Sequence, residues 1–143
     1  MNNFTFYSPT MFAFGQGEAS RVGALVRQFG GSKVLLMAGG GSVKKNGAYD
    51  AVAVSLKEAG LPWCELWGVQ ANPRSGKVYE GIELARTEGA DFLLAIGGGS
   101  VMDTAKLASI LMTDEYGIKE LLGTPGRAKK CIKTLMIPTT AGT

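Results

Sequence analysis

The sequence contains no histidine among its 143 residues. Histidine is the side chain that proteins use most often as a metal ligand and as a general acid or base near neutral pH. Any chemistry of this chain therefore proceeds without imidazole. Cysteine is scarce too, because Cys64 and Cys131 are far apart and have neither the spacing of a zinc site nor the density of a disulfide framework. We interpret both as free thiols of a protein in a reducing, cytoplasmic compartment.

Charge and long apolar runs are also limited. Charged residues make up 19% of the chain, and the formal net charge of +3 is spread along it apart from Lys129, Lys130 and Lys133. A nucleic-acid partner is not expected, because such binding needs a clustered basic face. A membrane partner is not expected either, since no apolar run approaches the roughly 20 residues that cross a bilayer. The length and the 45% of hydrophobic residues predict one ordered domain over residues 1–143.

What the sequence has in excess is glycine, with 21 residues gathered in clusters. Short apolar runs at residues 33–38 and 91–96 each end in Gly-Gly-Gly-Ser. Continuous apolar runs are typical of strands that are covered on both faces of a parallel sheet. Residues 63–67 alternate, with Trp63, Glu65 and Trp67 on one face, and predict a strand nearer the sheet edge. A fourth strand is predicted at residues 134–137.

The segments between these strands have helical periodicity. Helices are predicted at residues 18–29, 49–59, 75–88 and 101–112, with a short one at 118–122. Residues 4–7 and 11–14 could add a hairpin or edge strand ahead of this core. The alternation of strands and helices predicts an α/β fold, a Rossmann-like parallel sheet with helices on both faces.

In such a sheet, ligands bind beyond the carboxyl ends of the strands. Small residues follow all the predicted strands, and glycines let the backbone approach a bulky anion while a helix start offers N–H donors. The sequence therefore predicts a site for a nucleotide-like ligand. Its candidate residues are Gly39, Gly40, Gly41, Ser42, Asn72, Gly97, Gly98, Gly99, Ser100, Val101, Asp103, Thr139, Thr140 and Thr143.

Purely structural alternatives exist for several of these residues. A triple glycine can simply form a tight turn, and Asn72-Pro73 is a common turn start. Ser100 and Asp103 fit a helix N-cap with an acidic residue three positions later. Because a carboxylate repels a pyrophosphate, any ligand role of Asp103 would concern a ribose hydroxyl or a nicotinamide.

Spacing excludes several familiar sites. Lys44 and Met102 stand where G-x-G-x-x-G requires its last glycine, and neither a Walker A motif nor a G-x-S-x-G motif occurs. The chain therefore shows no catalytic acid, base or nucleophile of its own.

Five motifs in this order resemble the iron-containing (group III) alcohol dehydrogenases, specifically their butanol dehydrogenase-like branch. They are Phe6-x-x-Pro9-Thr10 with Phe14 to Gly17, the run from Gly39 to Gly47, Asn72-Pro73, the run from Gly97 to Lys106, and Pro138 to Thr143. The resemblance covers the whole chain. It implies the amino-terminal domain of a dehydroquinate synthase-like fold, in which a following helical domain, missing from this chain, supplies one aspartate and three histidines to a divalent metal, iron or zinc.

The resemblance also implies roles for individual residues. Gly98, Gly99 and Ser100 would hold the pyrophosphate of a dinucleotide. Asn72 and the pair Thr139-Thr140 would contact its adenosine half, and Asp103 would lie near the nicotinamide end.

Relatives that prefer NAD tend to carry an aspartate at the end of the first strand, where this chain has Gly39. The next carboxylate is Asp50. A 2′-phosphate would therefore meet no repulsion there and could contact Ser42 and Lys44 or Lys45. We expect NADP to be preferred over NAD.

The function implied is the NADP-binding portion of an oxidoreductase that interconverts alcohols and aldehydes, with weak cofactor binding and no turnover by this chain alone. Relatives often dimerise through their amino-terminal domains, so a homodimer is expected. Alternatives are a glycerol dehydrogenase-like enzyme of the same superfamily, a stand-alone nucleotide-binding or regulatory module without catalysis, and a flavodoxin-like domain with accidental glycine clusters.

Overall fold

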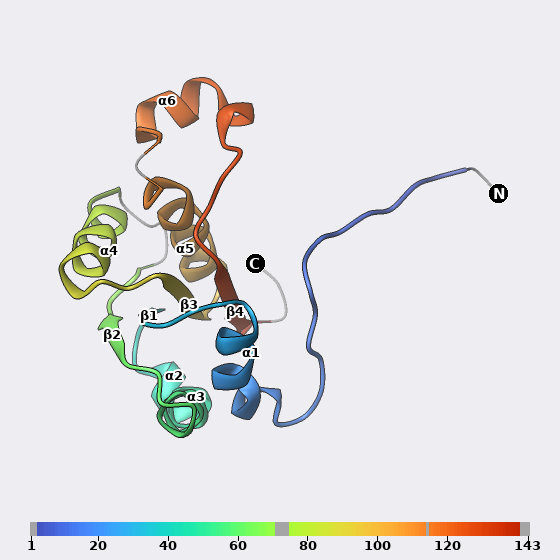
Figure 1. The fold of residues 1–143 in the computed structure, drawn as a ribbon, viewed down its shortest axis with the longest axis vertical. Coiled ribbons are helices and arrows are strands. Elements are labelled where there is room, and N and C mark those ends of the chain that lie inside the picture. Colours follow the sequence, from blue (N-terminus) through green and yellow to red (C-terminus); the bar gives the residue numbers. More distant parts are fainter. Residues whose placement is uncertain (1–2, 71–74, 114, 141–143) are drawn as a thin grey trace.

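The computed structural model describes residues 3–70, 75–113 and 115–140. A four-stranded parallel sheet forms the middle of three layers, with helices on both of its faces (Figure 1). The strands are β1 (Val34–Ala38), β2 (Trp63–Leu66), β3 (Phe92–Gly97) and β4 (Thr134–Pro138). Their order is β2-β1-β3-β4, and every neighbouring pair is parallel. The predicted α/β class, its parallel sheet and its strands are confirmed.

The two central strands carry the core. All residues of β1 and β3 are buried, as their continuous apolar sequences require. On one face, Leu36 and Leu94 pack with α1 (Val22–Gln28) and α3 (Ala48–Glu58). On the other face, Leu35 and Leu93 pack with α4 (Ser75–Glu88) and α5 (Gly99–Leu111). Successive side chains of a strand point to opposite faces, so each central strand serves both layers.

The remaining elements are short. They are the 3-10 turns η1 (Glu18–Arg21) and η2 (Pro125–Arg127) and the helices α2 (Ser42–Lys45) and α6 (Ile118–Gly123). The helix predicted over residues 18–29 thus begins as a 3-10 turn, and α2 was not predicted. No helix in the described ranges is long and apolar enough to cross a bilayer.

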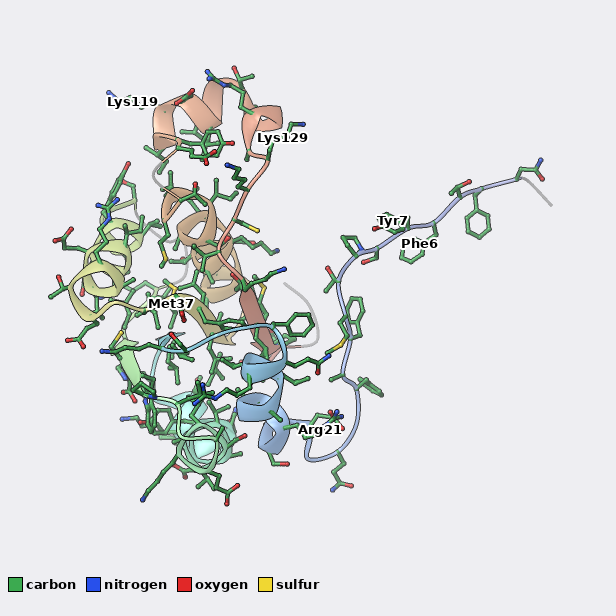
Figure 2. All side chains as sticks on the ribbon, in the orientation of Figure 1. Phe6, Tyr7, Arg21, Met37, Lys119 and Lys129 are labelled. Carbon is green, nitrogen blue, oxygen red and sulfur yellow. The ribbon has the colours of Figure 1, made fainter. Side chains whose placement is uncertain are left out.

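The expected hairpin or edge strand at the start of the chain is wrong. Residues 3–14 form neither strand nor helix and extend away from the sheet (Figures 1 and 2). Their aromatic side chains are exposed, with exposed fractions of 81% for Phe6 and 84% for Tyr7. The local sequence favours extended backbone, but a strand also needs a partner edge, and this segment lies beside none.

Candidate cofactor site

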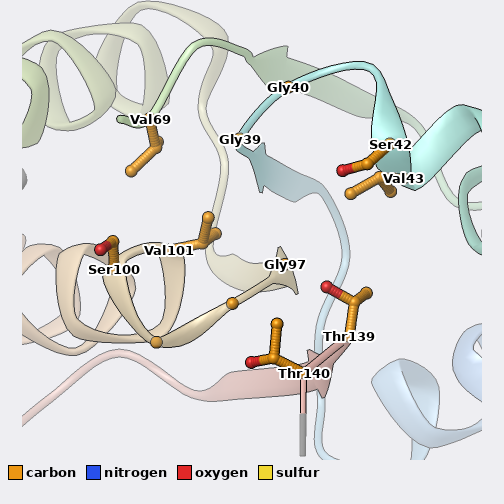
Figure 3. A pocket seen from close by; sticks show the side chains of 12 residues that line it. Gly39, Gly40, Ser42, Val43, Val69, Gly97, Ser100, Val101, Thr139 and Thr140 are labelled. Carbon is orange, nitrogen blue, oxygen red and sulfur yellow. The ribbon is translucent and has the colours of Figure 1, made fainter. Parts of the chain in front are cut away.

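A cavity of about 260 Å³ lies at the carboxyl edge of the sheet (Figure 3). In the sheet, β2 and β3 lie on opposite sides of β1. The connection after β1 therefore runs toward one edge of the sheet, and the connection after β3 runs toward the other. Such a switch point is where open α/β sheets bind ligands. The lining residues are Gly39, Gly40, Ser42, Val43, Val69, Gly97, Gly98, Gly99, Ser100, Val101, Thr139 and Thr140.

The glycines after β3 form one wall of this cavity. A Cβ atom on Gly97 would lie 2.6 Å from Cγ2 of Val101, so only glycine lets α5 start so close to the strand. A Cβ atom on Gly98 would lie 3.5 Å from Cγ2 of Thr140, which also lines the cavity. The Thr139 N–H donates to the Gly97 carbonyl at 2.9 Å, which holds the end of β4 beside this wall. A side chain at Gly98 would therefore fill space that is open in this protein.

The loops after β1 and β2 form the opposite wall. The Gly68 N–H donates to the Gly39 carbonyl at 2.9 Å, and the Val69 N–H donates to the Ala38 carbonyl at 3.3 Å. A Cβ atom on Gly39 would lie 3.2 Å from the Val69 carbonyl oxygen. This close approach places Val69 on the cavity wall.

The polar groups of the cavity suit an anion. Hydroxyl groups of Ser42, Ser100, Thr139 and Thr140 line it, and no carboxylate is among its lining residues. The first N–H groups of an α-helix have no partner within the helix and carry a partial positive charge. In α5 these groups belong to Gly99 and Ser100, both of which line the cavity. The residues present therefore fit the pyrophosphate of a dinucleotide.

The structure brings most of the predicted site residues together here, but not all. Gly41 does not line the cavity. Asp103 does not line it either, because its side chain is 70% exposed on α5, with Oδ1 3.5 Å from Nζ of Lys106. Asn72 and Thr143 lie outside the described residues. Their roles, like those of the lining residues, stay predictions.

Ser100 is not the helix N-cap that its sequence position suggested. The helix α5 begins two residues earlier than predicted, with Gly98 at the N-cap and no side-chain cap. The Gly98 carbonyl accepts hydrogen bonds from the N–H groups of Val101 and Met102, at 3.0 and 3.2 Å. Ser100 therefore lies in the first turn of α5 and lines the cavity, where it does not cap the helix.

Two lining residues, Val43 and Val69, were missed. Val43 is 1% exposed and is the first apolar residue after the first triple glycine, a signal that could have marked it. Val69 follows β2 in a loop and reaches the wall through the backbone hydrogen bonds described above. That pairing between two loops has no sequence signature.

The family model for iron-containing alcohol dehydrogenases matches residues 9–143 of this chain. The chain belongs to this family. The flavodoxin-like alternative is thereby excluded, and the resemblance read from the motifs is confirmed.

Individual relatives agree with this assignment. The chain is 49% identical over 106 residues, 74% of its length, to the "Probable NADH-dependent butanol dehydrogenase 2" of Bacillus subtilis and covers 27% of that protein. It is 39% identical over 106 residues, also 74% of its length, to the "NADPH-dependent aldehyde reductase YqhD" of Escherichia coli and covers 26% of it. The structure of NADH-dependent butanol dehydrogenase A from Thermotoga maritima superimposes with a TM-score of 0.87 at 38% identity, covering 100% of this chain and 36% of that one. The chain therefore spans about a third or less of the length of these relatives.

The family name implies iron, but the described residues do not fit a metal centre. The sequence has no histidine. Within the described ranges, no group of three or more cysteine, aspartate and glutamate side chains could hold a metal ion. The described residues therefore fit a candidate dinucleotide site better than a metal centre.

Proposed function

We propose that residues 1–143 form the dinucleotide-binding domain of an NAD(P)-dependent enzyme that interconverts alcohols and aldehydes. The observation that carries the proposal is the glycine-walled cavity at the switch point, where hydroxyl groups and the start of α5 face a space without carboxylates. Membership of the iron-containing alcohol dehydrogenases supports the reaction type. The names of the relatives, butanol dehydrogenases and an aldehyde reductase, support small alcohols and aldehydes as the substrate class.

In this proposal the chain binds and orients the cofactor. Gly98, Gly99 and Ser100 hold the pyrophosphate at the start of α5, and Thr139 and Thr140 contact the adenosine half from the end of β4. When bound, a nicotinamide dinucleotide supplies hydride transfer. The metal ligands of the complete enzyme would have to come from residues that this chain does not contain.

We further propose that NADP is preferred over NAD. Relatives are named for either cofactor, so the preference rests on this chain's own residues. Gly39 is the first residue after β1 and has no carboxylate. Ser42, which also lines the cavity, has a hydroxyl group that can donate to a phosphate. A 2′-phosphate would meet no negative charge among the lining residues, whereas a site for NAD would gain from an acidic partner of the 2′-hydroxyl.

Calorimetric titration of the 143-residue chain with NADP and with NAD tests both proposals. Tighter binding of NADP is expected. Equal or tighter binding of NAD would contradict the cofactor preference, and binding of neither would contradict the proposed function. We expect no reduction of butyraldehyde by NADPH, with or without added iron or zinc, because the described residues provide no metal-holding cluster. Turnover by this chain would contradict the proposal that it binds the cofactor without supplying the metal ligands.

We also propose that the chain forms a homodimer. The exposed aromatic side chains on residues 3–14 give it an apolar surface that extends away from its own core. Apolar surfaces of this kind mark sites of protein association.

A further inference from the structure

A group of side chains beside the cofactor cavity has no part in the proposed binding contacts. Its centre is Glu65 on β2. One carboxylate oxygen, Oε1, accepts hydrogen bonds from the Tyr49 hydroxyl at 2.6 Å and from the indole N–H of Trp63 at 2.8 Å. The other oxygen, Oε2, accepts one from the indole N–H of Trp67 at 2.6 Å. We call Tyr49, Trp63, Glu65 and Trp67 the aromatic platform.

The platform holds a lysine from the neighbouring helix. Nζ of Lys44 lies 4.4 Å from the ring centroid of Trp67 and 5.3 Å from that of Tyr49, within the range of cation–π attraction. The two rings are themselves in contact, with centroids 5.4 Å apart. Burial would raise the pKa of Glu65, but its three hydrogen bonds and the Lys44 charge hold that pKa below the usual 4.5. The carboxylate therefore stays charged at neutral pH and complements the ammonium group.

Lys44 belongs to the four-residue helix α2, which begins at the cavity. Ser42 and Val43 both line it (Figure 3). The two residues before α2 give little support, since a Cβ atom on Gly40 or Gly41 would meet no described atom within 4 Å. So short a helix is not stable by itself. The Asn46 N–H donates to the Ser42 carbonyl at 3.0 Å, and the side chains that hold α2 in addition are the buried Val43 and Lys44 on the platform.

The same geometry separates the two lysines of α2. Lys44 is directed to the platform, whereas Lys45 follows Ser42 by three positions and so shares its side of the helix. Lys45 forms no ion pair with any residue in the described ranges. The Lys45 side chain is exposed, three positions after Ser42 in α2.

We propose that Lys44 is a positioning residue, which fixes α2 to the aromatic platform so that Ser42 and Lys45 face the adenosine ribose and its 2′-phosphate. This inference rests on the proposed function, because it concerns the same cavity. The sequence left open whether Lys44 or Lys45 contacts the 2′-phosphate, and this proposal assigns the contact to Lys45. It also gives Glu65 and Trp67, which touch no cavity atom in this assignment, a role in cofactor binding.

The test compares two small probes that differ only in the phosphate of interest, adenosine 2′,5′-bisphosphate and 5′-AMP. Calorimetry gives the dissociation constants for wild type, Lys44→Met and Lys45→Met. Loss of the cation–π anchor lowers the population of correctly placed α2, so Lys44→Met should weaken both probes. We expect about a two- to fivefold loss for 5′-AMP and at least as large a loss for the bisphosphate, because the Lys45 contact to the 2′-phosphate also depends on α2. Lys45→Met should weaken only the bisphosphate, by about three- to tenfold, because a charged contact to the phosphate is lost.

Two further variants separate positioning from general damage. Lys44→Arg should restore both affinities, because a guanidinium also stacks on aromatic rings. Lys57→Met, on the exposed end of α3, changes the net charge equally and should leave both affinities unchanged. Trp63 and Trp67 are the two tryptophans of the chain, so tryptophan emission reports directly on the platform. It should change in Lys44→Met and stay unchanged in Lys57→Met.

The outcomes distinguish this inference from the proposed function. If wild type binds both probes and Lys44→Met binds them equally well, the positioning role is wrong. If Lys44→Met loses affinity for the bisphosphate alone, Lys44 contacts the phosphate directly and the assignment is again wrong. If wild type binds neither probe, the proposed function fails together with the inference. If wild type binds both equally, the NADP preference and the Lys45 assignment fail, while a uniform loss in Lys44→Met still supports the platform.

Discussion

Gly97 and Gly98 are neighbours at the end of β3, but an added side chain would have different consequences at the two positions. An alanine Cβ at Gly97 would press on the stiff side chain of Val101, at 2.6 Å from Cγ2. Gly97→Ala should therefore lower the free energy of unfolding by about 1–3 kcal/mol. At Gly98, φ is −83° and ψ is −173°, which any residue adopts, and the added atom would meet Thr140 at an ordinary contact distance of 3.5 Å.

Gly98→Ala should thus keep its stability but weaken dinucleotide binding, on the order of tenfold, because the methyl group occupies the space assigned to the pyrophosphate. Urea denaturation and calorimetric titration of both variants check this pair of expectations. A stable Gly97→Ala, or a Gly98→Ala that binds NADP like wild type, would contradict the placement of the cavity wall.

Tyr49 carries a prediction about pH. Its hydrogen bond to the Glu65 carboxylate, together with burial, raises the phenol pKa from 10.0 to about 12. A raised pKa means that the neutral phenol stabilises the fold fully below pH 10, and that this stabilisation is lost as the pH rises from about 10 to about 12. Glu65→Gln should bring the Tyr49 pKa back toward 10. Phenolate absorbance during a pH titration measures this shift, with Tyr49→Phe identifying the transition that belongs to this residue. An unchanged Tyr49 transition in Glu65→Gln would disprove the coupling.

At the scale of whole elements, α1 packs against α3 through Gly23. Its N–H donates to the Ser55 hydroxyl at 2.9 Å, and that hydroxyl donates to the Ser20 carbonyl at 2.7 Å. A Cβ atom at this position would lie 2.7 Å from Cβ of Ala59 and closer still to the Ser55 carbonyl oxygen. The helices can approach this closely only because position 23 has no side chain.

Gly23→Ala should therefore destabilise the protein by about 2–3 kcal/mol. The matched control is Gly76→Ala in α4, where a Cβ atom meets no described atom within 4 Å. There the same change should stabilise by about 0.5 kcal/mol, because alanine reduces the conformational freedom of the unfolded chain. Urea denaturation compares the two variants, and a stabilising Gly23→Ala would show that α1 can move away without loss.

The elements differ in how far the sequence alone predicts them, for physical reasons. The strands β1 and β3 were predicted to within a residue, because strands buried on both faces are continuously apolar and glycine clusters mark their ends. The helix α4 has the predicted bounds, Ser75–Glu88. The helix α2 was missed because one turn is too short for a periodic pattern and forms through tertiary contacts of Val43 and Lys44.

The sequence predicted where the cavity lies, at the carboxyl edge of the sheet, whereas the contacts of its residues with a cofactor stay predictions. The rule for parallel sheets places residues that follow β1, β3 and β4 at one edge, and the cavity lies there. Asp103 does not line the cavity, and the early start of α5 at Gly99 could not be predicted from glycine, which has low helix propensity. The residues of the aromatic platform come from α3, β2 and the loop after β2, so no local sequence pattern predicts the platform.

At the scale of the whole molecule, the exposed aromatic segment at residues 3–14 is the surface on which the proposed homodimer rests. Phe6 and Phe12 are each 81% exposed, and Phe14 is fully exposed. Exposed aromatic side chains gathered on one segment favour association, so we expect two chains to bury them against each other. Sedimentation velocity over a concentration series should show a dimer.

Replacing Phe6 and Phe12 together by serine should yield a monomer, because the two rings supply much of the apolar area that association removes from water. The melting temperature at low protein concentration and the dinucleotide affinity should not change, since these residues lie on a segment that extends away from the sheet and its cavity (Figure 2). Tyr79→Ser is the control, because Tyr79 is a 47% exposed aromatic on α4, outside this segment, and its loss should leave the dimer intact. A wild-type chain that sediments as a monomer at every concentration would refute the dimer, and a double variant that still dimerises would place the interface on another surface.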